Sequence, residues 1–245
     1  MSELNTLFSL HYLKSTAHDR TTIFNKANPK ISSTESFKSY PATDTVKLVT
    51  NWSLDEARIT PLIQRRRSLR SYDTKPIPLP DLSFMLWAGQ GITAKSGDHF
   101  LRAAPSAGAL YPIETYCAVL NVEGVEQGLY HLDVKNFQLE LLQSGNFGPA
   151  IMKACLGQTF IQTAGVVFIW TAIFRRNFQK FGDRGLRYVL FDAGHICQNT
   201  LLAIEAAGCG GCPVATFFDS ELNGLLEIDG NEEAVVYLAT AGTRK

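Results

Sequence analysis

The order of its predicted elements indicates that this chain is an α+β protein. Alternating runs separated by turn residues lie between residues 114 and 142 and predict an antiparallel meander. Gly165 to Phe174 is a continuous apolar run typical of a buried strand, and Leu186 to Ala207 has the spacing of a long amphipathic helix. With 245 residues, of which 45% are apolar and 19% charged, the chain is large enough to bury a core.

The N-terminal part differs in composition from the rest. Residues 1–50 are rich in Ser, Thr, Asn and Lys, and we expect an N-terminal wrapping segment there, followed by one domain over residues 51–245. One short amphipathic helix is expected within the segment, because four apolar residues recur at helical spacing. These residues are Leu7, Phe8, Leu10 and Leu13.

Two helices are predicted before the first strand. Asp55 to Arg66 is expected to be helical and to place a group of arginines at its C-terminal end. Three prolines between residues 76 and 80 are expected to break the chain. Asp81 is then expected to cap a helix that runs through Trp87 and ends at Gly89.

The remaining elements follow in order. Strands are predicted at residues 114–122, 129–132 and 137–142, then at Gly165 to Phe174 and at Ala234 to Thr240. The long helix carries an apolar stripe and is stopped by Gly208. The stripe consists of Val189, Ala193, Ile196, Cys197, Thr200, Leu201 and Ile204.

Charge and composition disfavour several classes of protein. A formal net charge of zero argues against a nucleic-acid partner. The first residues lack the features of a secretory signal, and no run reaches the roughly 20 apolar residues of a membrane span, so a cytoplasmic protein with no membrane partner is expected. Cys209 and Cys212 have a Cys-x-x-Cys spacing but lack the further ligands of a zinc site. We therefore expect two packed cysteines and no metal.

The basic segment from Arg65 to Arg70 is the most informative local feature. It holds four arginines and Ser68 within six residues, although the chain carries no net charge. Guanidinium groups repel one another and offer fork-like donors that match phosphate oxygens, so the segment favours a phosphate site. The alternative is a solvated helix end, where cations complement the negative pole of the helix dipole. The segment alone leaves both interpretations open.

Other segments carry candidate chemistry. The small residues from Ala104 to Pro112 would let the backbone approach a flat ligand, although taken alone this segment favours an ordinary loop that leads into a strand. The glycines and the proline from Gly208 to Pro213 would hold backbone N–H groups against a ring or a phosphate. His195 lies in the long helix, where a satisfied core histidine is the alternative to a catalyst. Lys180 is either a surface lysine or, if burial lowers its pKa, a proton acceptor.

Taken in order, these segments resemble the flavin nitroreductases. Residues 66–72, Arg-Arg-Ser-Leu-Arg-Ser-Tyr, are similar to the Arg-Arg-Ser-x-Arg-x-Phe/Tyr signature that opens such domains. Four further segments are similar to the narrower SagB-type dehydrogenase branch. They are the leader at 37–41 (Phe-Lys-Ser-Tyr-Pro), then residues 105–112 (Pro-Ser-Ala-Gly-Ala-Leu-Tyr-Pro), 187–188 (Arg-Tyr) and 194–199 (Gly-His-Ile-Cys-Gln-Asn). That branch aromatises thiazolines and oxazolines in ribosomal peptide natural products. The resemblance covers nearly the whole chain.

The resemblance implies an interlocked homodimer with a nitroreductase-like fold, in which a mainly antiparallel sheet is flanked by helices. It also implies FMN at each of two interface sites. Arg66, Arg67, Ser68 and Arg70 would hold the phosphate and ribityl chain, with Arg244 as a weaker second contact. The other residues that it assigns to the flavin are Pro105, Ser106, Ala107 and Gly108 from the partner protomer, Leu110, Gln198, and Pro213, Val214, Ala215 and Thr216 along the other side of the ring.

One departure from the branch concerns the catalytic base. Azoline-oxidising relatives carry a Lys-Tyr pair, thought to assist proton removal, and the corresponding pair here is Lys180 and Phe181. Either Lys180 suffices as the base, with His195 as the second candidate, or the protein oxidises another group, or it works as a reductase. Some larger relatives carry an extra peptide-binding domain, and in its absence we expect a partner protein to deliver the substrate.

Three functions stay open at this point. The first is an FMN-dependent dehydrogenase that oxidises an azoline or related group in a peptide or natural product by hydride transfer to flavin N5. The second is an NAD(P)H-dependent nitroreductase or quinone reductase, with hydride flowing into the flavin. The third is a non-catalytic flavin-binding partner subunit of a biosynthetic complex.

Overall fold

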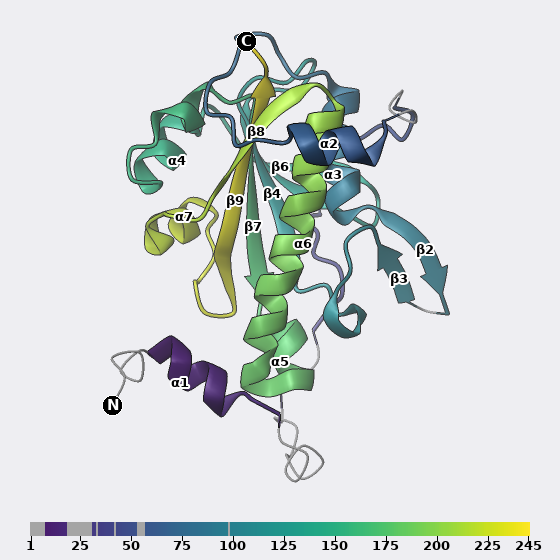
Figure 1. Cartoon of the computed structure of the whole chain (residues 1–245), viewed down its shortest axis with the longest axis vertical. Helices are drawn as coiled ribbons and strands as arrows, with labels where there is room; N and C mark the ends of the chain where they lie inside the picture. Colours follow the sequence, from purple (N-terminus) through teal and green to yellow (C-terminus); the bar gives the residue numbers. More distant parts are fainter. Residues whose placement is uncertain (1–7, 19–30, 33, 42, 53–56, 98) are drawn as a thin grey trace.

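A seven-stranded sheet forms the centre of the computed structural model, which describes residues 8–18, 31–32, 34–41, 43–52, 57–97 and 99–245. The strand order is β1-β6-β5-β4-β7-β9-β8, and all neighbours are antiparallel. The strands are β1 (Thr45–Lys47), β4 (Ile113–Val119), β5 (Gly128–Asp133), β6 (Gln138–Ser144), β7 (Val166–Ile173), β8 (Cys209–Val214) and β9 (Glu233–Thr243). The predicted α+β class and the meander of β4, β5 and β6 are confirmed (Figure 1).

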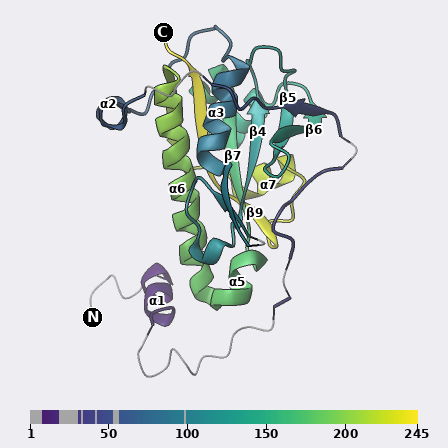
Figure 2. The same cartoon turned by 90° about the vertical axis from the view of Figure 1, so that its right-hand side faces the viewer.

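Helices cover both faces of this sheet. The long helices α3 (Leu79–Gln90) and α6 (Gly185–Ala206) pack on one face, and the short helices α4 (Gly148–Ala154) and α7 (Asp219–Leu225) pack on the other (Figure 1). Figure 2, turned by 90°, shows α3 and α6 from the side that they cover. Side chains alternate along β4, so Cys117 joins the core under α3 and α6, whereas Tyr116 joins the opposite core.

Helix α6 matches its prediction closely. It ends one residue before the expected end, and Gly208 follows in a left-handed conformation with φ +70°. All seven residues of the predicted apolar stripe are buried. Two shorter helices, α2 (Ile59–Arg65) and α5 (Arg175–Phe181), pack near opposite ends of α6 (Figure 1). None of the helices in the described parts of the chain is long and apolar enough to cross a membrane.

The N-terminal predictions need correction in detail. Helix α1 (Phe8–Ser15) is present as expected, and Leu7 lies outside the described residues. Helix α2 is confirmed but begins at Ile59, whereas Asp55 lies outside the described residues. Asp81 does not cap α3, because the helix already begins at Leu79, and it ends at Gln90 rather than at Gly89. Proline is tolerated in a first helical turn, so Pro80 lies within the first turn of this helix instead of breaking the chain.

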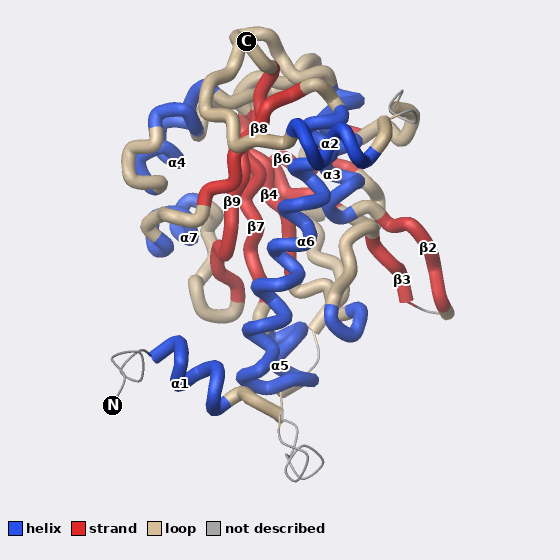
Figure 3. Tube along the Cα trace, viewed as in Figure 1, coloured by secondary structure: helices blue, strands red, loops and turns tan. Residues whose placement is uncertain are grey.

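Three strand regions were not predicted, and the first of them is the short edge strand β1. A separate hairpin of β2 (Ile92–Ser96) and β3 (His99–Arg102) lies apart from the main sheet (Figure 3). The glycine-rich segment after α6 was assigned to no element, and it is the edge strand β8. Apolar and polar residues do not alternate along this strand, and close packing against its neighbours requires small residues. A Cβ on Gly211 would lie 2.9 Å from the Thr240 carbonyl oxygen and 3.0 Å from Ile204 Cδ1.

Candidate functional site

The basic segment lies along the outer edge of β8. After α2 ends, Ser68 forms a parallel bridge with Gly211, and the Leu69 N–H donates to the Gly211 carbonyl at 2.9 Å. A Cβ on Gly210 would meet the Leu69 side chain at 2.9 Å, so the glycine lets the two segments approach closely. The structure therefore brings together two segments that are more than 130 residues apart and that were assigned separately to the flavin.

The arginines of this segment have different partners. Arg65 Nε pairs with the buried Glu205 at 3.3 Å, and Arg67 Nη1 donates to the Arg66 carbonyl at 2.7 Å. These two arginines fit the helix-end interpretation. Arg66 and Arg70 form no ion pair with a carboxylate among the described residues, and Arg70 lies 5.8 Å from the centre of the Phe160 ring. Two guanidinium groups are thus available for an anion.

Arg244, residues 213–216 and two cysteines also lie in or beside strand β8. Arg244 Nε donates to the Cys209 carbonyl at 2.9 Å, and its Nη2 pairs with Glu205, so this arginine already has protein partners. Pro213 and Val214 complete β8, and Ala215 and Thr216 are exposed directly after it. Cys209 and Cys212 are buried and not disulfide-bonded, as expected for packed cysteines.

A second group of candidate residues surrounds the loop from Pro105 to Tyr111. Ser106 Oγ donates to Asp192 Oδ2 of α6 at 2.6 Å, and the Tyr111 N–H donates to Ser106 Oγ at 2.9 Å. Burial raises the pKa of Asp192, and its hydrogen bond from Ser106 opposes that rise. Sequence reasoning missed Asp192. The feature that could have predicted it is its position next to Ala193 of the apolar stripe, because a carboxylate is buried there only if it has a partner.

The backbone of this loop is held in an unusual conformation. The φ angles of Gly108, Ala109 and Tyr111 are +67°, +53° and +45°, and the last value is rare for a bulky residue. Tyr111 is fixed by its neighbours, since its carbonyl accepts a hydrogen bond from Arg176 Nη1 at 2.9 Å. Strained backbone that persists through such contacts is concentrated at functional sites.

Lys180 of α5 lies against this loop. A Cβ built on Gly108 would be 2.8 Å from Lys180 Nζ and 3.4 Å from the Phe181 ring, so no side chain fits there without displacing the lysine. Lys180 Nζ is 5.5 Å from the centre of the Phe181 ring, which packs edge-on against Tyr188 with 4.8 Å between ring centres. The structure thus places the predicted base beside the predicted flavin loop.

The remaining candidates lie on α6 and in the loop. His195 is exposed, so the interpretation as a core histidine is wrong, and it follows Asp192 by one helical turn. Gln198 is exposed on the same helix, and Leu110 is half-buried.

The two groups of residues lie far apart within one protomer. Glu205 pairs with Arg65 of the basic segment, and Asp192 accepts a hydrogen bond from Ser106 of the loop. These two carboxylates are 13 residues apart on α6. At 1.5 Å per residue, this corresponds to about 20 Å along the helix axis. The two anchoring contacts therefore lie well apart along α6 within one chain.

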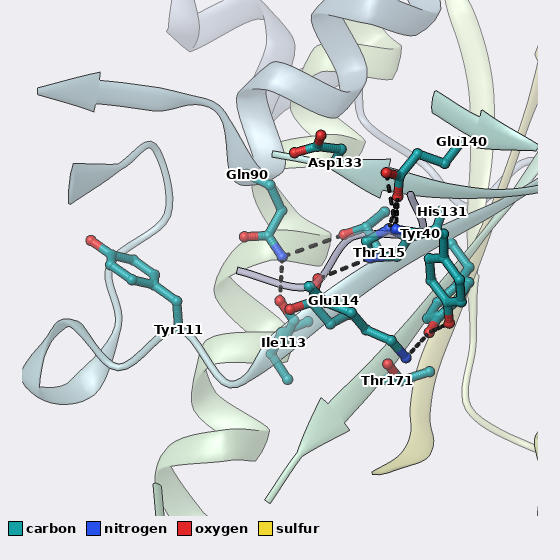
Figure 4. A network of polar contacts seen from close by, with 12 residues as sticks. Tyr40, Gln90, Tyr111, Ile113, Glu114, Thr115, His131, Asp133, Glu140 and Thr171 are labelled. Carbon is teal, nitrogen blue, oxygen red and sulfur yellow. Dashed lines mark hydrogen bonds and ion pairs between the residues drawn. The ribbon is translucent and has the colours of Figure 1, made fainter. Parts of the chain in front are cut away.

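A buried charge network supports the loop from the sheet side (Figure 4). Glu114 pairs with Arg176 and accepts from His131 Nε2 at 3.1 Å, while His131 Nδ1 contacts Glu140 at 2.9 Å. Burial disfavours the ionised form of Glu114, but the hydrogen bond from His131 and the charge of Arg176 hold its pKa at about 2. Burial also disfavours charge on His131, yet its two carboxylate partners raise its pKa above the usual value. The network therefore contains paired, buried ions.

Comparison with known families identifies the fold. Residues 63–243, most of the chain, match the nitroreductase family. The chain belongs to this family. A protein of Methanocaldococcus jannaschii that carries the name nitroreductase is 35% identical over 175 residues, which cover 71% of this chain and 87% of that protein.

Two further similarities involve longer proteins. The trifolitoxin-processing protein of Rhizobium leguminosarum is 30% identical over 139 residues, which cover 55% of this chain and 37% of that protein. A crystal structure of a nitroreductase from Anabaena variabilis has a TM-score of 0.69 at 28% identity and covers 84% of this chain. The chain spans only 42% of that Anabaena protein, so it accounts for less than half of either relative.

The same fold also occurs within a biosynthetic complex. A chain of the Escherichia coli microcin synthetase complex, solved with truncated pro-microcin bound, has a TM-score of 0.65 and covers 96% of this chain and 82% of that one. Its identity is 20%, so this similarity concerns the fold alone.

Proposed function

We propose that this nitroreductase-family protein is an FMN-dependent dehydrogenase of the SagB type, which oxidises an azoline or related group in a peptide or natural product. The observation that carries the proposal is the position of the Lys180 ammonium, which occupies the space where a Cβ of residue 108 would lie, beside a loop that resembles this branch. The similarity to a trifolitoxin-processing protein supports a peptide-modifying role.

The arginine group fits the phosphate of FMN. Arg66 and Arg70 have no carboxylate partner among the described residues, and a phosphate would neutralise both. Ser68 lies between them, and Ala215 and Thr216 are exposed at the end of the neighbouring strand. We assign these residues, with Arg67, Pro213 and Val214, to one half of the FMN site. Bound FMN would supply hydride transfer.

The loop group forms the other half of the proposed site and comes from a second copy of the chain. The separation of about 20 Å along α6 prevents one protomer from joining the two halves, whereas two antiparallel copies of α6 would place each half beside its complement. Leu190 and Phe191 of α6 are 51% and 58% exposed, and Ile63 of α2 is 59% exposed, which supports an apolar homodimer contact.

Lys180 is assigned the proton transfer. Oxidation of an azoline removes a proton as well as a hydride, so a base is needed within hydrogen-bond reach of the reacting carbon. Phe181 supplies no phenol, and Lys180 is the amine that contacts the loop. His195, exposed one turn beyond the loop's anchor at Asp192, is the second candidate.

Reduction of nitro compounds or quinones with NAD(P)H is the second candidate function. The family match and the relative from M. jannaschii favour it, because neither specifies a biosynthetic role. In this case the same residues hold the flavin, and Lys180 donates a proton instead of accepting one.

Stopped-flow reduction of the purified flavoprotein separates the two functions. As a dehydrogenase, the protein should be bleached slowly by NADPH and rapidly by an azoline-containing peptide. Rapid bleaching by NADPH, with no response to the peptide, would replace the dehydrogenase by the reductase. Loss of FMN during gentle purification would instead favour a non-catalytic partner subunit.

A further inference from the structure

A cavity lies between the Pro105–Tyr111 loop and the β2–β3 hairpin. Its volume is about 270 Å³. Three basic residues, His99, Arg102 and Lys135, line it together with Tyr111 and the rings of Phe37 and Phe100. None of the described residues that line it is acidic.

Arg102 is a buried cation without a counter-ion in contact. The residue is 6% exposed, and its guanidinium donates to two neutral acceptors, Gln90 Oε1 at 3.0 Å and the Ser36 carbonyl at 3.2 Å. Its Nε has no partner among the described residues. Burial lowers the pKa of Arg102 to about 10, and repulsion from Arg176 adds to this effect while attraction to Glu114 opposes it. A buried charge of this kind is costly unless an anion neutralises it.

The nearby carboxylates do not provide that anion. Glu114 pairs with Arg176 and His131. Glu35 and Asp133 line the adjoining cavity of about 370 Å³ rather than this one. Asp133 moreover accepts hydrogen bonds from the backbone N–H groups of residues 135 and 136, which fix a turn.

Tyr111 adds a donor beside the guanidinium. Its phenol oxygen accepts a hydrogen bond from the backbone N–H of Arg102 at 3.0 Å. The phenol donates to no acceptor among the described residues, so its hydrogen is available for a ligand. The Arg102 guanidinium lies 4.7 Å from the centre of the Tyr111 ring. Figure 4 shows that the phenol points away from the buried charge network. Tyr111, whose φ is +45°, is one of the residues that line the cavity.

We propose that this cavity binds a carboxylate-bearing ligand with an apolar or aromatic group. A carboxylate matches the donors of Arg102 and Tyr111, with the exposed Lys135 and His99 adding positive charge. Phe37 and Phe100 pack edge-to-face with 5.5 Å between ring centres and form an apolar wall. The volume of about 270 Å³ lies just below the roughly 300–1,000 Å³ of typical ligand pockets, which suits a small acid or one peptide residue.

This inference goes beyond the proposed function and does not depend on it. It concerns binding alone, so it is tested without flavin turnover or a known substrate. If both hold, the loop carries the flavin contacts on one side and the ligand's carboxylate on the other.

Isothermal titration calorimetry at low ionic strength tests the site with 3-phenylpropanoate and its neutral isostere 3-phenylpropanamide. The acid should bind to the full-length protein, and the amide should bind at least about tenfold more weakly, because it lacks the charge. Lys135→Glu should weaken binding of the acid by about two- to tenfold, as expected for an exposed charge. Lys153→Glu is the matched control, since it changes the net charge equally on the exposed surface of α4 and should have no effect.

Tyr111→Phe extends the test to the buried side of the site. The variant keeps the ring on Arg102 and removes the phenol, which is also the acceptor of the Arg102 backbone N–H, so the affinity should fall by about three- to tenfold. The melting temperature is recorded beside the affinity, because loss of this acceptor lowers the stability of the fold as well. Equal binding of acid and amide, equal binding of inorganic phosphate, or full affinity in Lys135→Glu would overturn the proposal.

Competition with a tripeptide ending in phenylalanine distinguishes two sources of the carboxylate. If the peptide acid displaces phenylpropanoate and the peptide amide does not, the ligand is a peptide C-terminus. If neither peptide competes, the site takes a free small acid. Either result supports a carboxylate site, whereas displacement by the peptide amide alone would contradict it.

Discussion

Arg66 and Arg70 are the side chains on which flavin binding is expected to depend most. The purified protein should be yellow, with about one FMN per chain. Replacing either arginine by Ala should weaken FMN binding by about ten- to a hundredfold, given about 1.5–3 kcal/mol for a hydrogen bond to a charged group. Fluorescence titration of the apoprotein with FMN measures the change.

The structure provides matched controls for this prediction. Arg67→Ala should have a smaller effect, because Arg67 donates to the carbonyls at the end of α2. Arg175→Ala removes an arginine that pairs with Glu232 and should leave FMN affinity unchanged. Retention of full affinity in the Arg66→Ala/Arg70→Ala double variant would show that the phosphate binds elsewhere.

Lys180 is the side chain on which turnover is expected to depend. If the protein is a dehydrogenase, Lys180→Ala should reduce turnover by about 10²–10⁴-fold, the usual contribution of a positioned acid or base. The flavin absorbance spectrum should not change, since Lys180 is not assigned to FMN binding. Phe181→Tyr is expected to raise activity if only the phenol is lacking. Normal turnover of Lys180→Ala on the true substrate would remove the lysine from the mechanism.

Individual site residues could be predicted only in part. The arginine segment was found because charge clustering is visible in sequence, but which arginines are free depends on Glu205, a carboxylate that lies 140 residues away. Asp192 and Arg102 were missed because a buried charge is recognised by its partners, and those partners come from other elements. Lys180 and Gly108 were both named, but nothing in their spacing indicates that they touch.

The central strands are held together by the buried charge network. His131 has a raised pKa, so its charged form stabilises the fold fully below the unfolded pKa of about 6.5, and this stabilisation is lost as the pH rises through the folded pKa. The free energy of unfolding should therefore decrease on the alkaline side. Urea unfolding at pH 6 and pH 9, at a fixed FMN concentration, measures this slope.

His131→Gln provides the test of its origin. The substitution leaves Glu114 and Glu140 without their shared cation and should cost about 3–5 kcal/mol at pH 6, as for other broken buried pairs. The variant should also lose part of the alkaline slope. His11→Gln is the control, because His11 is exposed on α1. An unchanged slope in His131→Gln would show that another group titrates.

Elements with strong periodicity were predicted well, and elements defined by close packing were not. Strand β7 and helix α6 bury long apolar runs, so their patterns are local properties of the chain. Strand β8 is held by pairing with β9 and by the arginine segment, neither of which is visible in its glycine-rich sequence. Helix α3 was misplaced at its ends because prolines can begin a helix as well as break a chain.

At the scale of the whole molecule, FMN retention and dimerisation should be linked. If each site takes one half from each protomer, dilution that dissociates the dimer should release FMN over the same concentration range. Light scattering and flavin absorbance, recorded across one dilution series, measure both quantities. A monomer that keeps stoichiometric FMN would contradict the shared site.

The sequence could predict the family but not the arrangement of its site. The ordered segments indicate the nitroreductase family, which the match over residues 63–243 confirms. The distance between the anchors of the two proposed halves follows from the positions of Asp192 and Glu205 on α6. Those anchoring contacts exist only in the folded chain.

Complementation between two defective protomers tests the shared FMN site most directly. One variant carries Arg66→Ala and Arg70→Ala, and the other carries Gly108→Val, which places a side chain against Lys180. Each homodimer should bind FMN poorly, whereas a heterodimer purified with two affinity tags should contain one intact site and bind about one FMN per dimer. If each site lies within a single protomer, both protomers of the heterodimer remain defective. A heterodimer that binds no more FMN than either homodimer would therefore contradict the account.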